Sequence, residues 1–173
     1  PHSLSVTETD AAGNVSERSE PIAFTVDTDA PDAAAGLQLV NNDADPATPI
    51  ASGSSTSDNT PLLSGTAEAN STIIVYDGQT PIGTATADEE GAWSYSPILT
   101  DGQHNLSVTV TDAAGNVSEL SNIIAFNVDT VAPSAVTELS IANNSVSGEP
   151  VIIPNGGLTN DSTPLFSGAG DPG

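Results

Sequence analysis

The nine residues TDAAGNVSE occur at positions 9–17 and again, unchanged, at positions 111–119. The similarity extends beyond this stretch, because residues 1–31 and 103–133 share 23 identities over 31 positions. A catalytic motif is rarely duplicated in this way, whereas a structural unit often is. A repeat period of about 100 residues is longer than that of solenoid repeats and indicates a tandem array of small domains.

A second pair of similar segments supports the same period. SDNTPLLSG at 57–65 resembles NDSTPLFSG at 160–168. The related segments DTDAP at 27–31 and DTVAP at 129–133 are the expected linkers between domains. We therefore predict three parts: the C-terminal strands of one repeat at 1–29, a complete repeat at 30–130, and the N-terminal strands of the next repeat at 131–173.

The charge of the chain restricts its partners. Lys and Arg together number 1 against 23 Asp and Glu, which gives a formal net charge of -22. This excess excludes nucleic acid and anionic membranes as natural partners and favours cations. The chain has no cysteine, so it can form neither disulfides nor a thiolate metal site. Its apolar runs are only a few residues long, and we expect no membrane insertion of this fragment.

The local patterns predict strands and no helices. LSVTVTD at 106–112 alternates apolar and polar residues, the period of a half-buried strand. Seven such strands are predicted, ended by Gly, Pro, Asp or Asn, at 37–42, 61–67, 72–77, 80–87, 92–96, 104–112 and 121–129. They indicate an all-β sandwich with a core that includes Leu63, Ile74, Trp93, Leu106, Val108 and Phe126.

Three long segments of the complete repeat resemble a known family. They are DNTPLLSGTAEANSTIIVYDG, IGTATADEEGAWSYSP and DGQHNLSVTVTDAAGNVSE. Together they are similar to the bacterial immunoglobulin-like (BIg) domains that are repeated many times in giant surface adhesins secreted by type I systems. The resemblance implies a seven-stranded immunoglobulin-like sandwich in a secreted, cell-surface stalk. It also implies that Ca²⁺ is bound between neighbouring repeats and that a host receptor or glycan is bound by other parts of the parent protein.

The acidic residues near the linkers are the candidate metal ligands. In a seven-stranded sandwich, the loops at 67–71, 87–91 and 112–116 lie at the end that meets the incoming linker. We therefore expect Glu68, Asp88, Glu89 and Asp112 to approach Asp27 and Asp29 of the linker. Ca²⁺ needs six to eight oxygen ligands, and we select Asp27, Asp29, Asp88 and Asp112 as the ligands at this junction. Asp129 is the corresponding candidate in the second linker. That linker has Val131 where the first has Asp29, so the two junctions are not expected to be chemically equivalent.

Several of these residues also have a purely structural interpretation. Asp112 can cap a turn by accepting hydrogen bonds from backbone amides. Asp77 and Asp101 each precede a glycine and are more typical of hairpin turns than of ligands. His104 occupies the start of a strand, as His2 does one repeat earlier, and is interpreted as structural rather than as a zinc ligand or a general base.

Two functions remain open after these observations. The first is a stalk or spacer in which neighbouring repeats are the main partners of each repeat. The alternative is an immunoglobulin-like module that binds a host glycan or protein through its loops. Such a binding face is expected to show exposed aromatic residues or a concave patch. Aromatic residues make up only 3% of the chain, which favours the spacer. No arrangement typical of an enzyme is present, and the flanking partial repeats are expected either to be disordered or to pair between molecules.

Overall fold

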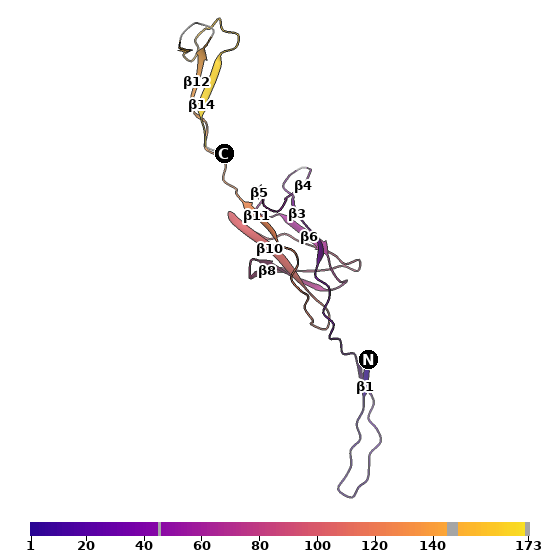
Figure 1. Cartoon of the computed structure of the whole chain (residues 1–173). Helices are drawn as coiled ribbons and strands as arrows, with labels where there is room; N and C mark the ends of the chain where they lie inside the picture. The colour runs from indigo at the N-terminus through magenta and orange to yellow at the C-terminus, as the bar shows by residue number, and fades with distance from the viewer. Residues whose placement is uncertain (45, 145–148, 172–173) are drawn as a thin grey trace. The chain divides into compact units, whose positions relative to one another are not determined.

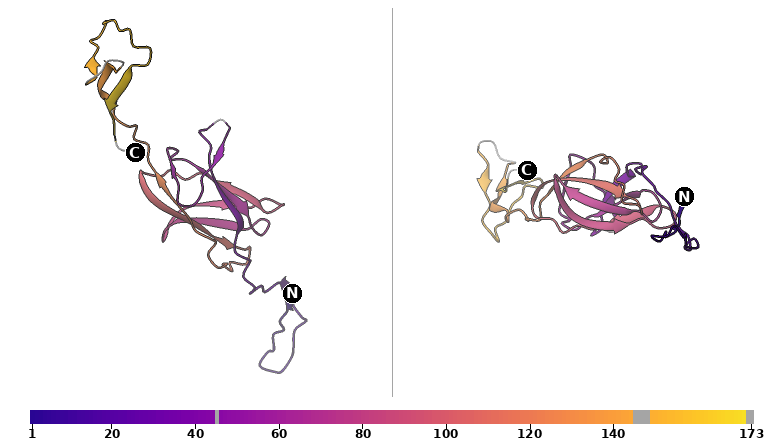
Figure 2. Two further views of the ribbon diagram at one scale, coloured as in Figure 1. Left: turned by 45° about the horizontal axis from the view of Figure 1, so that its top comes forward. Right: turned by 90° about the horizontal axis from the view of Figure 1, so that it is seen from below.

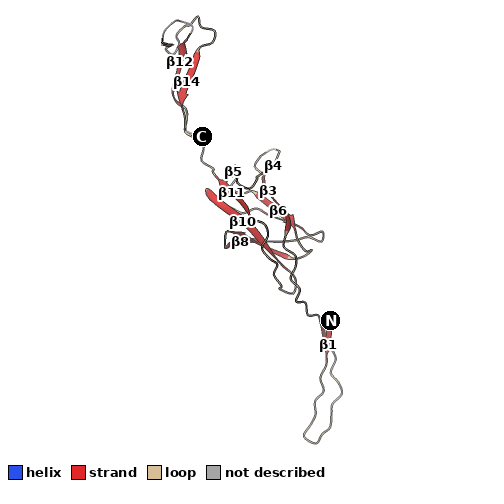
Figure 3. Cartoon of the chain, in the orientation of Figure 1, coloured by secondary structure: helices blue, strands red, loops and turns tan. Residues whose placement is uncertain are grey.

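The computed structural model describes residues 1–44, 46–144 and 149–171. Within these ranges the chain contains strands, turns and loops and no helix (Figure 3). Consequently, no helix among the described residues has the length and apolar character needed to cross a membrane. The chain divides into two compact units, residues 1–130 and residues 131–173, and the division falls inside the DTVAP linker.

Among its described residues, the complete repeat has nine strands in two sheets. Figure 1 shows where the labelled strands lie. Seven of the nine strands correspond to the predicted strands, and two short ones, β4 and β5, were not predicted. The strands are β3 (Ala35–Asn41), β4 (Thr48–Pro49), β5 (Ser55–Thr56), β6 (Leu62–Thr66), β7 (Thr72–Asp77), β8 (Thr80–Thr86), β9 (Ala92–Tyr95), β10 (Gly102–Thr111) and β11 (Ile124–Val128). One sheet has the order β4-β3-β6-β9, and the other has the order β5-β11-β10-β7-β8.

The segment that follows β3 connects the two sheets. β4 pairs with β3 in the first sheet, whereas β5 pairs in parallel with β11 in the second sheet. All the other pairings of the repeat are antiparallel. At the opposite side of the sandwich, the edge strands β9 and β8 are also in contact. The Tyr95 hydroxyl on β9 donates to the carbonyl oxygen of Ile82 on β8 at 2.8 Å. Both edges of the sandwich are therefore tied together.

The hydrophobic core lies between the two sheets, which face each other in Figure 2. Both sheets contribute to it, and its largest fully buried side chains are Phe126, Leu63, Ile73, Leu106, Val75, Val108, Val110 and Val128. Leu106, Val108 and Val110 are buried, as the alternation along 106–112 predicted, but the strand is not half-buried there, because Ser107 is buried as well. The prediction for Ile74 is wrong: Ile73 and Val75 are buried instead, because they pair with the buried Val110 and Val108 of β10.

The N-terminal hairpin repeats the pairing of β10 with β11. Its strands are β1 (His2–Leu4) and β2 (Ile22–Phe24), and His2 pairs with Phe24 as His104 pairs with Phe126. The register is therefore the same in both copies at an offset of 102 residues. The apolar side chains of this hairpin are exposed, whereas most of their equivalents in the complete repeat are buried.

The C-terminal unit repeats the pairing of β3 with β4 and β6. Its strands are β12 (Thr137–Asn143), β13 (Val151–Ile152) and β14 (Leu165–Ala169), in the order β13-β12-β14. Ile141 pairs with Phe166 as Leu39 pairs with Leu63, and an irregularity near the start of β12 matches one near the start of β3. Sequence similarity at the two ends of the chain is thus accompanied by the same backbone pairing.

Candidate functional site

The loop that follows β10 is organised around Asp112. Its Oδ1 accepts hydrogen bonds from the backbone amides of Gly115 at 2.7 Å and Asn116 at 2.8 Å. Its Oδ2 accepts a hydrogen bond from the Asn116 side chain at 2.8 Å. These bonds, the side-chain bond from Asn116 above all, outweigh desolvation and hold the pKa of Asp112 below its usual value. The carboxylate therefore caps its own loop, as the structural interpretation of Asp112 predicted.

The same loop is formed in the N-terminal hairpin. Asp10 accepts hydrogen bonds from the Asn14 amide at 2.8 Å and from the Asn14 side chain at 2.7 Å. The Asn14 side chain is the main cause of a lowered pKa at Asp10 as well. The loop thus keeps its geometry without the other strands of a sandwich around it, which indicates that the nine residues of the repeat encode it locally.

Asp88 occupies the turn between β8 and β9 and caps this turn. Its Oδ1 accepts the backbone amides of Glu90 at 3.0 Å and Ala92 at 2.7 Å. Gly91 in the same turn has a φ of 83°, and a Cβ there would collide with the carbonyl oxygen of Ala67. The turn and the loop between β6 and β7 are consequently in direct contact, and the Ala67 amide donates to the Gly91 carbonyl at 2.9 Å.

The first linker meets the loop of Asp112. Asp27 Oδ1 accepts the amide of Asp29 at 3.1 Å, so the two predicted ligands belong to one local turn. The Asn116 side chain donates to the carbonyl oxygen of Asp27 at 3.3 Å. Asn116 thus connects the linker to the Asp112 loop. Because Asn116 donates hydrogen bonds to both Asp112 and Asp27, the linker and this loop are neighbours. The sequence predicted this position for the loop.

Asp129 follows β11 at the opposite end of the complete repeat. Its backbone amide donates to the carbonyl oxygen of Thr56 at 2.9 Å, which extends the pairing of β5 with β11. Next to it, Asp101 Oδ1 accepts the amide of Thr130 at 3.1 Å and its hydroxyl at 2.9 Å. Asp101 therefore fastens the start of the second linker to the turn before β10. The role is structural, but the predicted hairpin turn is wrong, because β9 and β10 lie in different sheets.

The candidate ligands are not gathered into one ready-made site. Among the described residues, no group of three or more His, Cys, Asp or Glu side chains is placed to hold a metal ion. The structure brings Asp27, Asp29 and the Asp112 loop into one region through hydrogen bonds and gives Asp88 a separate turn. Ca²⁺ ligation by these residues stays a prediction, and it would require additional oxygen ligands such as carbonyl groups.

A hollow beside the first linker contains two acidic residues: Glu68, which was expected to approach the linker, and Asp32, which the sequence analysis did not select. It has a volume of about 390 Å³ and is lined by Asp32, Ala33, Ala35, Thr66, Ala67 and Glu68. Glu68 belongs to the loop at 67–71, and Asp32 directly follows the proline of the first linker. Asp32 directly follows DTDAP, and this position is the signal in the sequence that could have identified it as a further candidate ligand.

Two serines of the repeated segment, Ser118 and Ser121, form hydrogen bonds with the edge of β10 as a neighbouring strand would. Ser121 Oγ accepts the amide of Val108 and Ser118 Oγ accepts the amide of Val110, each at 2.9 Å. The backbone amides of both serines donate in return to the carbonyl oxygens of the same valines at 2.9 Å. The spacing of three residues between these serines, which recurs at Ser16 and Ser19, is the signal in the sequence that could have revealed this arrangement.

His104, which is buried, forms a pair with the half-buried Asp77. Its Nδ1 lies 2.7 Å from Asp77 Oδ2, and its Nε2 lies 2.8 Å from the carbonyl oxygen of Thr100. Both partners are acceptors, so only the doubly protonated ring donates to both. Burial alone would lower the pKa of His104, but the hydrogen bonds to Asp77 and Thr100 and the charge of Asp77 raise it above its usual value. The pair joins β10 to the end of β7, and this is a structural role.

The comparisons with known proteins agree with this architecture. Residues 39–130 match the family described as bacterial Ig-like domain. No curated protein matches the chain. The matched range runs from β3 to the residue after Asp129 and includes the whole of both sheets except the first residues of β3. Domains of this kind have a non-catalytic fold and are typically extracellular or surface-associated structural or binding modules. The chain therefore belongs to the bacterial Ig-like domain family.

Proposed function

We propose that this chain is a stalk or spacer segment of a bacterial cell-surface adhesin. The observation that carries the proposal is the second copy of the hairpin: the same residues form the same register, loop and serine bonds 102 positions apart. A tandem array of near-identical modules with contacts only between neighbours is suited to setting a distance from the cell surface.

The distribution of aromatic side chains supports a spacer over a binding module. Trp93 and Phe126 are buried in the core of the complete repeat, and Tyr95 is half-buried with its hydroxyl bonded to Ile82. Tyr76 is half-buried as well. The complete repeat thus has no fully exposed aromatic ring among its described residues, whereas glycan and protein recognition commonly depends on such rings.

We further propose that Ca²⁺ stiffens the first junction. We expect Asp27, Asp29 and Asp112 to bind the ion. Carbonyl groups of the linker and the Asp88 carboxylate are the further ligands in this proposal. The hydrogen bond between Asn116 and Asp27 supports this assignment, because it holds the linker against the loop that carries Asp112. The charge of -22 supports it too, since a bound dication reduces repulsion among carboxylates. Asp129 is the candidate at the second junction, which has no acidic residue at position 131.

Small-angle X-ray scattering on the chain, and on longer chains of two and four complete repeats, tests the spacer. The proposal predicts that the maximum dimension grows in proportion to the number of repeats in 1 mM Ca²⁺ and less steeply in chelator. The variant Asp27→Ala/Asp29→Ala removes the Ca²⁺ effect at the first junction, and Glu17→Ala/Glu20→Ala is the control with the same loss of charge. A dimension that does not grow with repeat number contradicts the spacer, whereas growth that is insensitive to Ca²⁺ contradicts only the metal.

A further inference from the structure

The complete repeat bonds its last strand directly to a segment near its beginning. β5 lies parallel to β11, with Ser55 opposite Asn127 and Thr56 opposite Val128. The chain enters the repeat through the linker at 27–31, before β3, and leaves it through the linker that follows β11. β5 and β11 therefore belong to opposite halves of the repeat along the chain, and a tension between the two linkers pulls them in opposite directions.

Hydrogen bonds of two kinds join these segments. Three are backbone bonds, which run from the amide of Gly53 to the carbonyl oxygen of Ala125 at 2.6 Å, from the amide of Asn127 to that of Ser54 at 2.9 Å, and from the amide of Asp129 to that of Thr56 at 2.9 Å. The Ser52 hydroxyl also donates to the Ala125 carbonyl oxygen and accepts from the Ala125 amide, each at 3.3 Å. Both kinds of bond hold the same edge of β11.

β5 is fastened in turn to the end of β3. Asp58 follows β5, and its Oδ2 accepts the amide of Asn42 at 3.0 Å while its Oδ1 accepts the amide of Thr60 at 2.8 Å. The Thr56 hydroxyl accepts a hydrogen bond from the Asn41 side chain at 3.4 Å and one from the Asp58 amide at 3.1 Å. Thr56 and Asp58 are both buried. A pull on β3 is therefore transmitted to β5 through these two side chains.

The direction of the strands determines how the contact between β5 and β11 responds to tension. Tension pulls β5 toward its N-terminal end and β11 toward its C-terminal end. Because the two strands are parallel, these pulls are opposed along one axis, and all the bonds between the strands are loaded together in shear. An antiparallel pair such as β7 and β8, pulled from its open end, would instead separate one bond at a time. Several bonds that must break in one step present the larger barrier.

We infer that the pairing of β5 with β11 is the mechanical clamp of the repeat, the contact that must break before the repeat unfolds under tension. The inference rests on the proposed stalk, because a stalk carries load from one linker to the next. Forced unfolding is governed by the unfolding rate and not by the free energy of unfolding. The bonds of the clamp therefore set the lifetime of the repeat under load, whereas contacts elsewhere in the sandwich contribute to its equilibrium stability.

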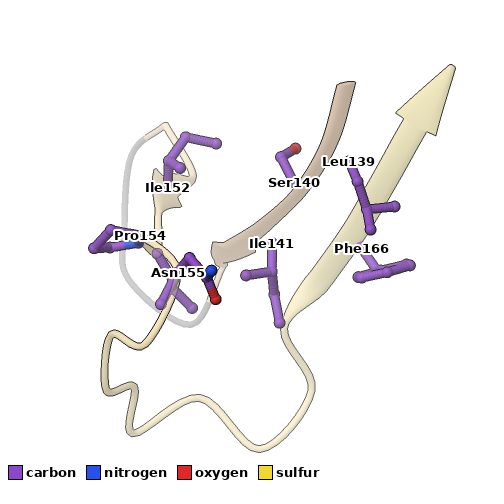
Figure 4. A pocket seen from close by; sticks show the side chains of 8 residues that line it. Leu139, Ser140, Ile141, Ile152, Pro154, Asn155 and Phe166 are labelled. Atoms are coloured by element: carbon purple, nitrogen blue, oxygen red, sulfur yellow. The ribbon is translucent and has the colours of Figure 1, made fainter. Parts of the chain in front are cut away.

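The turn that leads into the clamp recurs in the next repeat. The turn at 51–54 corresponds to the turn at 154–157, and in each the amide of the last residue donates to the carbonyl oxygen of the first, at 3.1 Å and 2.7 Å respectively. The third residue of each turn is a glycine with a positive φ. Asn155, labelled in Figure 4, takes the place of Ser52, and its side chain can likewise both donate and accept. Successive repeats thus carry the same element.

Magnetic tweezers that hold the 173-residue chain by its two ends at constant force test the inference. The extension released by residues 35–128 identifies the complete repeat, and the measured quantity is its lifetime before unfolding. Ser52→Ala removes both hydroxyl bonds to Ala125 and is expected to shorten this lifetime roughly fivefold or more. Ser52 is exposed, so this variant keeps the fold. Asn127→Pro removes the donor of a backbone bond and is expected to shorten the lifetime further.

Tyr95→Phe is the control, because it removes the hydrogen bond between β9 and β8, outside the clamp. It is expected to lower the free energy of unfolding in urea and to leave the lifetime under force within about twofold of the parent. A lifetime of Ser52→Ala equal to that of the parent overturns the inference, and so does a lifetime of Tyr95→Phe as short as that of Ser52→Ala. These results concern the strength of one repeat, so they are separate from the scattering dimensions that test the spacer.

Discussion

Replacement of Asp77 by Asn removes a charge while it preserves the shape of the side chain. Asp77 Oδ1 accepts the Asn105 amide at 2.8 Å, and an Asn carbonyl oxygen can keep this bond. The amide nitrogen of Asn then faces His104 Nδ1, so His104 must be neutral with its proton on Nε2. We expect Asp77→Asn to destabilise the complete repeat by about 1.5–3 kcal/mol below pH 6, the contribution of a hydrogen bond to a charged group. For a domain of this size, the loss lowers Tm by roughly 6–24 °C.

The destabilisation caused by Asp77→Asn is expected to depend on pH. The pKa of His104 is raised in the folded state, so the stability from the pair is fully present below the unfolded-state pKa of about 6.5. This stability is lost as the pH rises through the folded-state pKa of His104. The difference in unfolding free energy between the parent and Asp77→Asn therefore becomes smaller in that pH range. Urea unfolding between pH 5 and 9, followed by Trp93 fluorescence, measures the difference. Asp101→Asn is the control, because Asp101 bonds Thr130 and no histidine. A difference that is constant or grows with pH refutes the reasoning.

Four substitutions, one of them a control, test the packing and the backbone contacts by the same unfolding measurement. Leu63→Ala leaves a cavity in the core and is expected to cost about 2–5 kcal/mol, so a loss below about 1 kcal/mol contradicts the position of Leu63 between the sheets. Gly91→Ala is expected to cost clearly more than Gly115→Ala, since both have a positive φ but only Gly91 has a carbonyl oxygen in the place of its Cβ; equal losses count against the contact. Ser121→Ala leaves a buried strand amide without its acceptor and is expected to cost about 1–3 kcal/mol, whereas unchanged stability shows that the amide has another partner.

Much of the fold could be predicted because the strands carry their own pattern. The alternation at 106–112 fixes one face of β10, and the duplication of TDAAGNVSE identifies a structural unit. The face of β7 could not be chosen in the same way, because Ile73, Ile74 and Val75 form a continuous apolar run. Its register depends on β10, a partner that lies about thirty residues later in the chain.

The candidate site was predicted only in part, for a related reason. Sandwich topology correctly places the Asp112 loop beside the first linker, and the structure adds that Asn116 makes the connection. The distances between carboxylates on separate loops depend on how the turns are capped, and Asp88 and Asp112 each cap their own turn. The pairing of His104 with Asp77 joins residues 27 positions apart and likewise could not be predicted from either residue alone.

Isothermal titration calorimetry with Ca²⁺ tests the metal-stiffened junction most directly. The chain is compared with Asp27→Ala/Asp29→Ala and with the control Glu17→Ala/Glu20→Ala, and each is melted with and without 1 mM Ca²⁺. The account predicts saturable binding and a raised Tm for the parent and the control, and a clear reduction of both for the linker variant. Absence of binding at millimolar Ca²⁺, or binding that the linker variant retains in full, contradicts it.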